Sequence, residues 1–381
     1  MKILHVAPSI ESAYGGPTQS LAGYTSASQM VGADVDIAAP LPSRREIDVL
    51  EEAGAHRVET FRGYGRGSTA ASPALVRWVR ANARNYDIVH VHGLFNFIST
   101  FAARAAIASG SPVVIRPFGT LSQYTFKHRR GLLKRLWFEA LERPNISRAA
   151  AIHFTTTTEK NEAEWNHLDI GRRAAVVPPP FIPASSLVSR QTDPRNPVAL
   201  FLGRLHPVKN LEALIDAWPI ILQTHPDAVL RIAGHGTPRY TAELKRRAGK
   251  RGVQFMGFLT GTEKAMMLQQ ASLLVLPSLH ENFGIAVVEA IAEGLPVVIS
   301  EHVQLRDFVA ANELGTVTTG SPDSLAAAIS AAFVDLDLHR RVSEKGRRLV
   351  SQTYSPEVIG NRLTSMYLSA LKHHRERPTA S

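Results

Sequence analysis

The sequence predicts an α/β protein made of two domains, each built around a parallel β-sheet. Short apolar runs rich in β-branched residues alternate with longer helical patterns along the whole chain, which is typical of β-α units. The alternation is interrupted once, by a proline-rich stretch from Val177 to Pro183, and it restarts at Val198. At 381 residues the chain is long enough for two buried cores.

Each half of the chain contains five expected strands. In the first half they cover 3–7, 35–39, 88–92, 113–116 and 151–155. In the second half they cover 198–202, 228–233, 253–256, 273–276 and 297–299, with a helix over 211–223. We therefore expect a first domain at 1–183, a linker at 184–197, a second domain at 198–354, and a C-terminal helix and tail at 355–381.

The last of these segments begins with a helix start signal, because Ser355 can cap a helix and Pro356 suits its first position. Its apolar residues then recur at helical spacing, at Ile359, Leu363, Met366 and Ala370. Such a stripe needs a surface to bury against, and either domain can supply it.

The composition excludes several classes of protein. With no cysteine, the chain has no disulfide, no thiolate metal site and no cysteine nucleophile. No apolar run approaches the 18–20 residues or so that a membrane span needs. The start, from Met1 to Pro8, is interpreted as a buried strand and not as a signal peptide, so we expect a cytoplasmic protein.

Glycines and histidines follow the first-domain strands, at the sheet edge where doubly wound domains bind ligands. Gly15 and Gly16 precede an expected helix, and paired glycines there allow the backbone to approach a phosphate. His90 and His92 point to one face of their strand, and His92 is nearer the following loop. A neutral imidazole at that place can bind a hydroxyl or transfer a proton, whereas His90 can be a hydrogen-bonded core residue.

The second domain repeats this arrangement. Arg204 and Lys209 lie five residues apart on the turn after its first strand, where both cations can converge on a diphosphate. Gly234, after the next strand, allows close backbone approach. No third metal ligand of suitable spacing accompanies the two histidines, so we predict no metal site.

The most specific pattern is the run from His280 to Glu289, which crosses from a strand into a helix. Glu281 precedes that helix and Glu289 lies about two turns inside it, so the carboxylates cannot form a close acid/base pair. They would instead touch different parts of one extended ligand. A surface cap for Glu281 and a salt bridge for Glu289 are the structural alternatives.

Together these motifs resemble glycosyltransferase family 4. The resemblance rests on the Gly-Gly loop, D-I-V-H-V-H-G, G-R-L-H-P-V-K-N and E-N-F-G-I-A-V-V-E, and it spans nearly the whole chain in the expected order. It implies the GT-B fold, in which two Rossmann-like doubly wound domains face a central cleft and the C-terminal helix crosses back to the first domain. It also implies a retaining enzyme that uses a nucleotide sugar and needs no metal or other cofactor.

The resemblance assigns a role to each motif. The donor, a UDP- or GDP-linked hexose, would be bound by Gly15, Gly16, Arg204, Lys209, Gly234, Phe283, Gly284, Ile285 and Glu289. His92 and Glu281 would be the catalytic pair, with Glu281 on the hydroxyls of the transferred sugar. The chain departs from the family at His235, where an acidic residue often stands between two glycines.

Half of the net charge of +10 lies in 127–148, which holds seven basic and two acidic residues. If 131–143 is helical, one stripe contains Leu133, Leu136, Trp137, Ala140 and Leu141. A stripe at this spacing suits the core face of a domain helix. A basic helix with an interfacial Trp also suits the surface of an anionic membrane, at its inner face, with a lipid-linked saccharide as acceptor.

Two other functions are consistent with parts of this pattern. A catalytically silent protein that only binds nucleotide sugars would use the same binding residues, and turnover alone separates it from an enzyme. A nucleic-acid-binding protein would account for the positive charge, but the chain lacks the interleaved aromatic and basic motifs of the known modules. The leading prediction is therefore a hexosyltransferase acting on a hydroxyl acceptor in polysaccharide or glycolipid biosynthesis.

Overall fold

The structure is a computed structural model that describes residues 1–10, 16–41, 44–65, 70–122, 125–126, 131–164, 168–181, 197–249 and 252–376. The chain forms two compact units. Unit 1 comprises Met1–Pro180 together with Tyr354–Ser381, and unit 2 comprises Phe181–Thr353. The expected linker at 184–197 lies outside the described residues except for Pro197.

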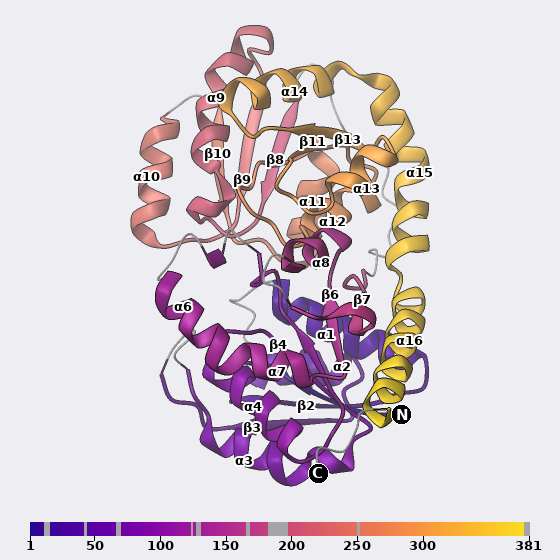
Figure 1. Cartoon of the computed structure of the whole chain (residues 1–381). Helices are drawn as coiled ribbons and strands as arrows, with labels where there is room; N and C mark the ends of the chain where they lie inside the picture. Colours follow the sequence, from indigo (N-terminus) through magenta and orange to yellow (C-terminus); the bar gives the residue numbers. More distant parts are fainter. Residues whose placement is uncertain are drawn as a thin grey trace. The chain divides into compact units, whose positions relative to one another are not determined.

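Unit 1 contains a seven-stranded sheet in the order β3-β2-β1-β4-β5-β6-β7, and every neighbouring pair is parallel (Figure 1). Its strands are β1 (Lys2–Val6), β2 (Asp34–Pro40), β3 (Arg57–Phe61), β4 (Ile88–His92), β5 (Val113–Arg116), β6 (Ala151–Phe154) and β7 (Ala174–Val176). Its helices are α1 (Gly16–Met30), α2 (Arg44–Glu52), α3 (Pro73–Asn82), α4 (Phe97–Ala108), α6 (Gly131–Trp137), α7 (Arg143–Arg148), α8 (Thr157–Ala163) and α16 (Pro356–Arg375). Short turns of helix complete it: η3 (Ala83–Asn85), the π-helical η4 (Phe138–Glu142) and η6 (Gly171–Arg173).

Helix α16 packs against α1 on one face of this sheet, as the stripe of the C-terminal segment requires. Ser355 Oγ accepts a hydrogen bond from the Val358 amide at 3.4 Å and so caps the helix. The four expected stripe residues are all buried against unit 1, beside Tyr24 and Ala27 of α1. The prediction that the last helix crosses back to the first domain is therefore confirmed.

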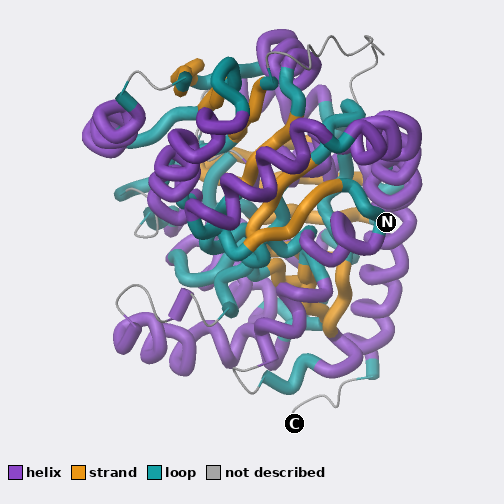
Figure 2. Tube along the Cα trace, turned by 90° about the horizontal axis from the view of Figure 1, so that it is seen from above, coloured by secondary structure: helices purple, strands orange, loops and turns teal. Residues whose placement is uncertain are grey.

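Unit 2 contains a six-stranded parallel sheet in the order β10-β9-β8-β11-β12-β13. Its strands are β8 (Val198–Leu202), β9 (Val229–Ala233), β10 (Val253–Gly257), β11 (Leu273–Leu276), β12 (Val297–Ser300) and β13 (Gly315–Thr318). Its helices are η7 (Pro207–Lys209), α9 (Leu211–Thr224), α10 (Pro238–Ala248), α11 (Gly261–Gln270), α12 (Ile285–Ala292), α13 (Arg306–Ala311), α14 (Pro322–Val334) and α15 (Leu336–Tyr354). Figure 2 shows helices flanking the strands. The predicted α/β class with two Rossmann-like sheets is confirmed.

The segment 131–148 differs from the expected core helix. Leu133 and Leu136 are 64% and 58% exposed, whereas Phe138 and Glu142 are buried. The inner positions therefore lie one residue after the apolar stripe, and a π-helical turn, η4, follows the two exposed leucines. The prediction that the apolar stripe forms the core face of a domain helix is therefore wrong for these two leucines.

A search of the described residues for membrane-crossing segments finds no helix that combines sufficient length with sufficient apolar character.

Candidate active site

The loop after β8 places the first cation pair of unit 2. Arg204 is exposed, and its side chain makes no hydrogen bond or ion pair with the described residues. His206 caps the turn η7 by accepting from the Val208 amide at 3.2 Å. Lys209 ends η7, and Asn210 follows in the left-handed region, at a φ of 56°, before α9 begins. The ammonium of Lys209 is thereby turned toward the loop that carries Glu281.

The loop between β11 and α12 holds the first glutamate. The Glu281 amide donates to His302 O, and Glu281 O accepts from the Gln304 amide, both at 3.2 Å, so the backbone there is fixed by the loop after β12. Gly284 is the N-cap of α12, at a φ of 84°, and a Cβ there would lie 3.3 Å from the Leu276 side chain. Glycine is needed at this position, and it lets the first turn of α12 present its free amides to a ligand.

Lys209 and Glu281 form an ion pair, although they lie 72 residues apart in the sequence. The lysine engages Glu281 Oε2, and their side chains are 14% and 17% exposed. In the described part of the chain, Glu281 Oε1 has no partner. The neighbouring His280 is largely buried, and this burial is the main cause of its lowered pKa. The pair therefore leaves one carboxylate oxygen for a ligand beside the N-terminus of α12.

Glu289 is held in a similar way. It lies in α12 with its side chain 8% exposed, and its Oε1 accepts from Lys264 Nζ at 2.6 Å. Lys264 comes from α11 and was not singled out from the sequence. The sequence indicated only that Glu289 needs a cationic partner, because an unpaired carboxylate inside an apolar helix is unfavourable. Among the described residues, Glu289 Oε2 has none.

The glycines after β9 allow the backbone of their loop to pack closely against the loop after β8. A Cβ on Gly234 would lie 1.8 Å from the carbonyl oxygen of Gly203, and one on Gly236 would lie 2.4 Å from that of Leu205. The close approach expected at Gly234 is thus made to a neighbouring loop. Beside it is a pocket of about 410 Å³ that is lined by Gly234, His235, Thr241, Lys245 and Phe258, among others.

In unit 1, the Gly-Gly loop is described only in part. Gly15 lies outside the described residues, and Gly16 is the first residue of α1. The N-terminus of α1 follows the carboxyl end of β1, as expected for a ligand-binding turn.

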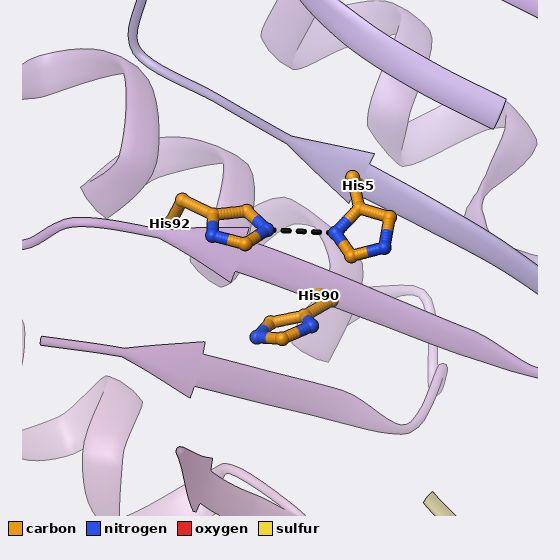
Figure 3. Close-up of side chains that lie close together, drawn as sticks. All are labelled: His5, His90 and His92. Carbon is orange, nitrogen blue, oxygen red and sulfur yellow. Dashed lines mark hydrogen bonds between the residues drawn. The ribbon is translucent and has the colours of Figure 1, made fainter. Parts of the chain in front are cut away.

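His92 ends β4, and its ring is only 2% exposed. His5 and His90 lie next to it, and the closest contact joins His5 Nδ1 and His92 Nε2 at 2.7 Å (Figure 3). A substrate can reach this ring only if the groups that cover it move. His5 comes from β1, so its proximity follows from the pairing of β1 with β4 and not from sequence spacing.

The three histidines bring ligand nitrogens within 4.8 Å of one another, which raises the question of a metal ion. Tetrahedral zinc ligands at 2.0–2.1 Å from the ion would lie about 3.4 Å apart. Both ring nitrogens of His90 are engaged, by Tyr367 at 2.9 Å and by His153 at 3.2 Å. The positive charge of Arg116 also acts on all three rings. These residues can bind a metal only if His90 releases its partners.

Arg116 and Glu159 are buried charges that the sequence analysis missed. Arg116 is 1% exposed, and its guanidinium lies 4.0 Å from the Phe118 ring and 4.6 Å from the Tyr24 ring. Glu159 accepts from the Thr155 amide at 2.6 Å and from the Gly119 amide, and burial raises its pKa. Its carboxylate therefore fixes the loop that follows β5.

The comparisons with known proteins agree with this layout. Residues 15–180 match the family described as glycosyl transferase 4-like domain, and residues 187–349 match the glycosyl transferases group 1. The chain belongs to the family 4 glycosyltransferases. Each sequence family covers one unit, so the resemblance inferred from the motifs is confirmed.

Relatives of this glycosyltransferase chain include an uncharacterised glycosyltransferase of Methanocaldococcus jannaschii, 34% identical over 176 residues. That match covers 45% of this chain and 45% of the relative, so less than half of the relative is spanned. A phosphatidyl-myo-inositol mannosyltransferase of Propionibacterium freudenreichii is 26% identical over 359 residues, which cover 89% of this chain and 87% of the relative.

Among solved structures, HepE of Anabaena, in complex with UDP and glucose, is 21% identical. It superimposes with a TM-score of 0.76, over 97% of this chain and 100% of that one. The fold of the family 4 chain is therefore GT-B. The cleft between its two domains stays a prediction, as do the residue roles.

Proposed function

We propose that this protein is a retaining glycosyltransferase that moves a hexose from a UDP- or GDP-linked donor to a hydroxyl acceptor. The observation that carries the proposal is the meeting of Lys209, Glu281 and the N-terminus of α12 beyond the strands of the unit 2 sheet. Cations and free helix amides there suit a diphosphate, and a carboxylate beside them suits sugar hydroxyls. The complex of Anabaena HepE with UDP and glucose supports this choice of donor class.

The two glutamates would divide the donor between them. Glu281 Oε1 would accept from hydroxyls of the transferred sugar, and Glu289 Oε2 from the ribose hydroxyls. Each carboxylate has one oxygen engaged by a lysine and the other without a partner in the described chain, so neither needs to break its ion pair. Arg204, which is exposed and has no partner there, would close on the diphosphate.

In the proposed reaction, the acceptor oxygen bonds to the anomeric carbon as the bond to the leaving phosphate oxygen breaks. The acceptor proton passes to that phosphate oxygen, on the same face of the sugar, so the anomeric configuration is retained. The growing charge on the diphosphate is stabilised by Arg204, Lys209 and the amides of Phe283, Gly284 and Ile285, so the proposal includes no metal ion. His92 would bind a hydroxyl at the reaction centre.

Donor binding is tested by thermal unfolding with UDP, GDP, ADP and NAD. A nucleotide at 100 times its dissociation constant should stabilise the folded protein by about 2.7 kcal/mol. One diphosphate should do so for wild type, and the effect should shrink in Glu289→Gln, which keeps the shape and loses the charge. Glu243→Gln, an exposed carboxylate on α10, is the control.

Turnover separates the enzyme from a silent binding protein. Glu281→Gln should retain nucleotide binding and lose most transfer, while Arg204→Ala should weaken both. The anomeric configuration of the product, read by NMR, tests retention directly. A wild-type protein that binds the nucleotide and transfers no sugar to any acceptor would contradict the proposal.

We further propose that the protein acts at the inner face of a membrane, on a lipid-linked saccharide, in polysaccharide or glycolipid biosynthesis. The support is the surface of α6, where Leu132, Leu133 and Leu136 are 74%, 64% and 58% exposed. These leucines belong to a segment, 127–148, whose sequence carries a net charge of +5. Apolar insertion and attraction to anionic headgroups act together on such a surface.

Sedimentation with vesicles tests this docking surface. Wild type should bind vesicles that contain phosphatidylglycerol and release them at high salt, because the charge attraction is screened. The triple substitution Leu132→Ser, Leu133→Ser and Leu136→Ser should reduce binding at least tenfold. The matched control replaces Val334, Leu336 and Leu368, which are also 58–71% exposed, with serine. Equal loss in both triples, or no wild-type binding, would refute the membrane contact.

A further inference from the structure

His92 is joined to a second buried histidine by a hydrogen bond. His5 Nδ1 lies 2.7 Å from His92 Nε2, and the two rings are stacked with their centroids 5.0 Å apart (Figure 3). His5 pairs in register with His90, so His92 lies one side-chain step further along the same face of the sheet. Both rings are almost fully covered, at 0% and 2% exposure.

The shared hydrogen bond couples the tautomers of the two rings. Burial is the main cause that lowers the pKa of His5 to about 3, and burial also holds the pKa of His92 well below its usual range. Both imidazoles are therefore neutral near pH 7, and each carries one N–H. If His5 donates, His92 carries its proton on Nδ1; if His92 donates, its Nδ1 is a bare acceptor.

The other two histidines of this sheet face form a closed chain. His153 Nε2 must donate to Val177 O at 2.6 Å, so its Nδ1 accepts from His90 Nε2 at 3.2 Å. His90 Nδ1 then accepts from the Tyr367 hydroxyl at 2.9 Å. Every ring nitrogen of these two histidines has a partner. The Val177 carbonyl, which can only accept, sets the direction of all the hydrogen bonds in the series. His90 and His153 are thus structural residues that connect β4, β6 and α16.

The His5–His92 pair is open in comparison. His5 Nε2 and His92 Nδ1 are buried atoms without a hydrogen-bond partner in the described chain. An unpartnered buried polar atom is unfavourable, and native proteins keep few of them. In contrast to the closed chain on the same face, this pair keeps one ring nitrogen of His92 for a further partner.

We propose that His5 is a positioning residue for His92. Its hydrogen bond with Nε2 holds the ring and couples the tautomer of His92 to that of His5, which leaves Nδ1 for a hydroxyl of the donor sugar or of the acceptor. This role rests on the proposed function, since it assigns His92 to a sugar-transfer site. His5 itself need not touch substrate.

Two substitutions of His5 separate positioning from packing. In His5→Asn the side-chain amide lies near the place of Nδ1 and can still donate to His92 Nε2. In His5→Gln the amide extends one carbon further, toward the place of Nε2, and does not reproduce that bond. The control is Tyr367→Phe, which removes a hydrogen bond from the closed chain and leaves the open pair intact.

We expect His5→Gln to lower kcat by about 10–100-fold, the range seen when a residue that orients an active group is removed. His5→Asn should stay within about threefold of wild type, and Tyr367→Phe should lower the melting temperature without changing kcat. The KM for the donor and the KM for the acceptor are measured separately, because the one that rises identifies which hydroxyl His92 binds. Equal kcat for the Gln and wild-type proteins, or equal loss in the Asn and Gln variants, would overturn the proposal.

A second readout needs no turnover. The ¹⁵N shifts of the His92 ring report its tautomer, and we expect one tautomer in wild type and in His5→Asn but a mixture in His5→Gln. A mixture already present in wild type would overturn the positioning role. If wild type shows one tautomer but transfers no sugar, the proposed function fails while the coupling of the two rings stands.

Discussion

Burial, and to a smaller extent the charge of the buried Arg116, sets the protonation state of four histidines on one face of the unit 1 sheet. The guanidinium of Arg116 has ring faces on two sides, and among the described residues it makes one hydrogen bond, at 3.4 Å to Thr155 Oγ1. Burial and this cation both lower the pKa values of His5, His90, His92 and His153. The four imidazoles are therefore neutral in the folded protein and become cationic near pH 6.5 only when it unfolds.

This difference makes the protein sensitive to acid. Because the unfolded state binds more protons below pH 6.5, the free energy of unfolding falls there by about 1.4 kcal/mol per pH unit for each such histidine. The buried Glu142 and Glu159 act in the opposite direction, since their raised pKa values favour the folded state as pH falls. Four histidines outweigh two carboxylates, and we expect a net loss of about 2–6 kcal/mol between pH 6.5 and 5.

Urea unfolding monitored at several pH values measures this loss. His5→Asn removes one of the four groups, so its plot of unfolding free energy against pH should be less steep by about 1.4 kcal/mol per unit. A wild-type free energy that stays constant from pH 7.5 to 5 would show that the imidazoles titrate normally.

The sequence could identify site residues that belong to a local motif, but not their partners across the fold. Glu281 and Glu289 were found because a strand-to-helix run with two carboxylates is unusual. Lys264 and His5 were not, because nothing in their local sequence marks them: Lys264 of α11 meets Glu289 of α12, and His5 meets His92 through the pairing of β1 with β4, only in the folded chain. The Lys209–Glu281 ion pair likewise joins two motifs whose contact depends on the sheet order.

At the scale of elements, apolar residues in the strand itself decided which strands could be predicted. Even the edge strand β10, which contains no fully buried residue, was found from Val253, Phe255 and Met256. All ten expected strands exist, and their ends differ from the expected ones by a residue or so. The strands that were missed are β3, β7 and β13, each of which forms the edge of a sheet. Edge strands are covered on fewer sides, and β3 and β7 contain no fully buried residue, so their sequences lack the continuous apolar run.

The helical stretch from α6 to α7 was mispredicted for a different reason. Its apolar stripe was expected to face the core, but two of its leucines lie on the surface. Its inner positions are taken by charged side chains that find partners in unit 1. Lys134 lies over the rings of Phe95 and Phe126, and burial lowers its pKa to about 8. Glu142 Oε1 accepts from Trp137 Nε1, Thr100 Oγ1 and the Phe95 amide. Hydrophobic periodicity cannot predict such positions.

Glu142 should therefore anchor this stretch, and its two oxygens predict how substitutions behave. Oε1 accepts three hydrogen bonds at 2.6–3.0 Å, while Oε2 is buried and has no partner among the residues that the structure describes. Glu142→Gln keeps the acceptor and removes the cost of a buried charge, so it should change the unfolding free energy by less than about 1 kcal/mol. Glu142→Ala leaves three donors unpaired and should cost about 3 kcal/mol or more.

Chemical denaturation of both variants decides between these roles. The nearby Glu139, which is exposed and pairs with Arg143, is a suitable control. Its replacement by Gln should cost at most about 0.5 kcal/mol, as for other exposed helix pairs. If Glu142→Gln is as unstable as Glu142→Ala, the carboxylate must be ionised and its charge must be required.

At the scale of the whole molecule, the chain returns to its first unit after completing its second. Consecutive helices α15 and α16 are divided between the units at Tyr354, so the last part of the chain completes the core around α1 and β1. The cooperativity of unit 1 then depends on residues more than 300 positions from its first strand. Such long-range closure is slow to form, because its loop entropy must be offset by contacts made late.

Two glycines test this division of the C-terminal helices. A Cβ on Gly360 of α16 would lie 2.2 Å from the carbonyl oxygen of Ala27 in α1, and one on Gly346 of α15 would lie 2.4 Å from that of Ile291 in α12. Valine at either site forces two helices apart, at a cost of about 1–3 kcal/mol or more. Gly360→Val should weaken unit 1 alone, and Gly346→Val should weaken unit 2 alone.

Hydrogen exchange of the strand peptides measures the stability of each unit separately. Gly360→Val should accelerate exchange in β1 and β4, and Gly346→Val should accelerate it in β11 and β12. If each variant accelerated exchange equally in both sheets, the two units would unfold as one cooperative block, and the C-terminal helices would stabilise the molecule as a whole.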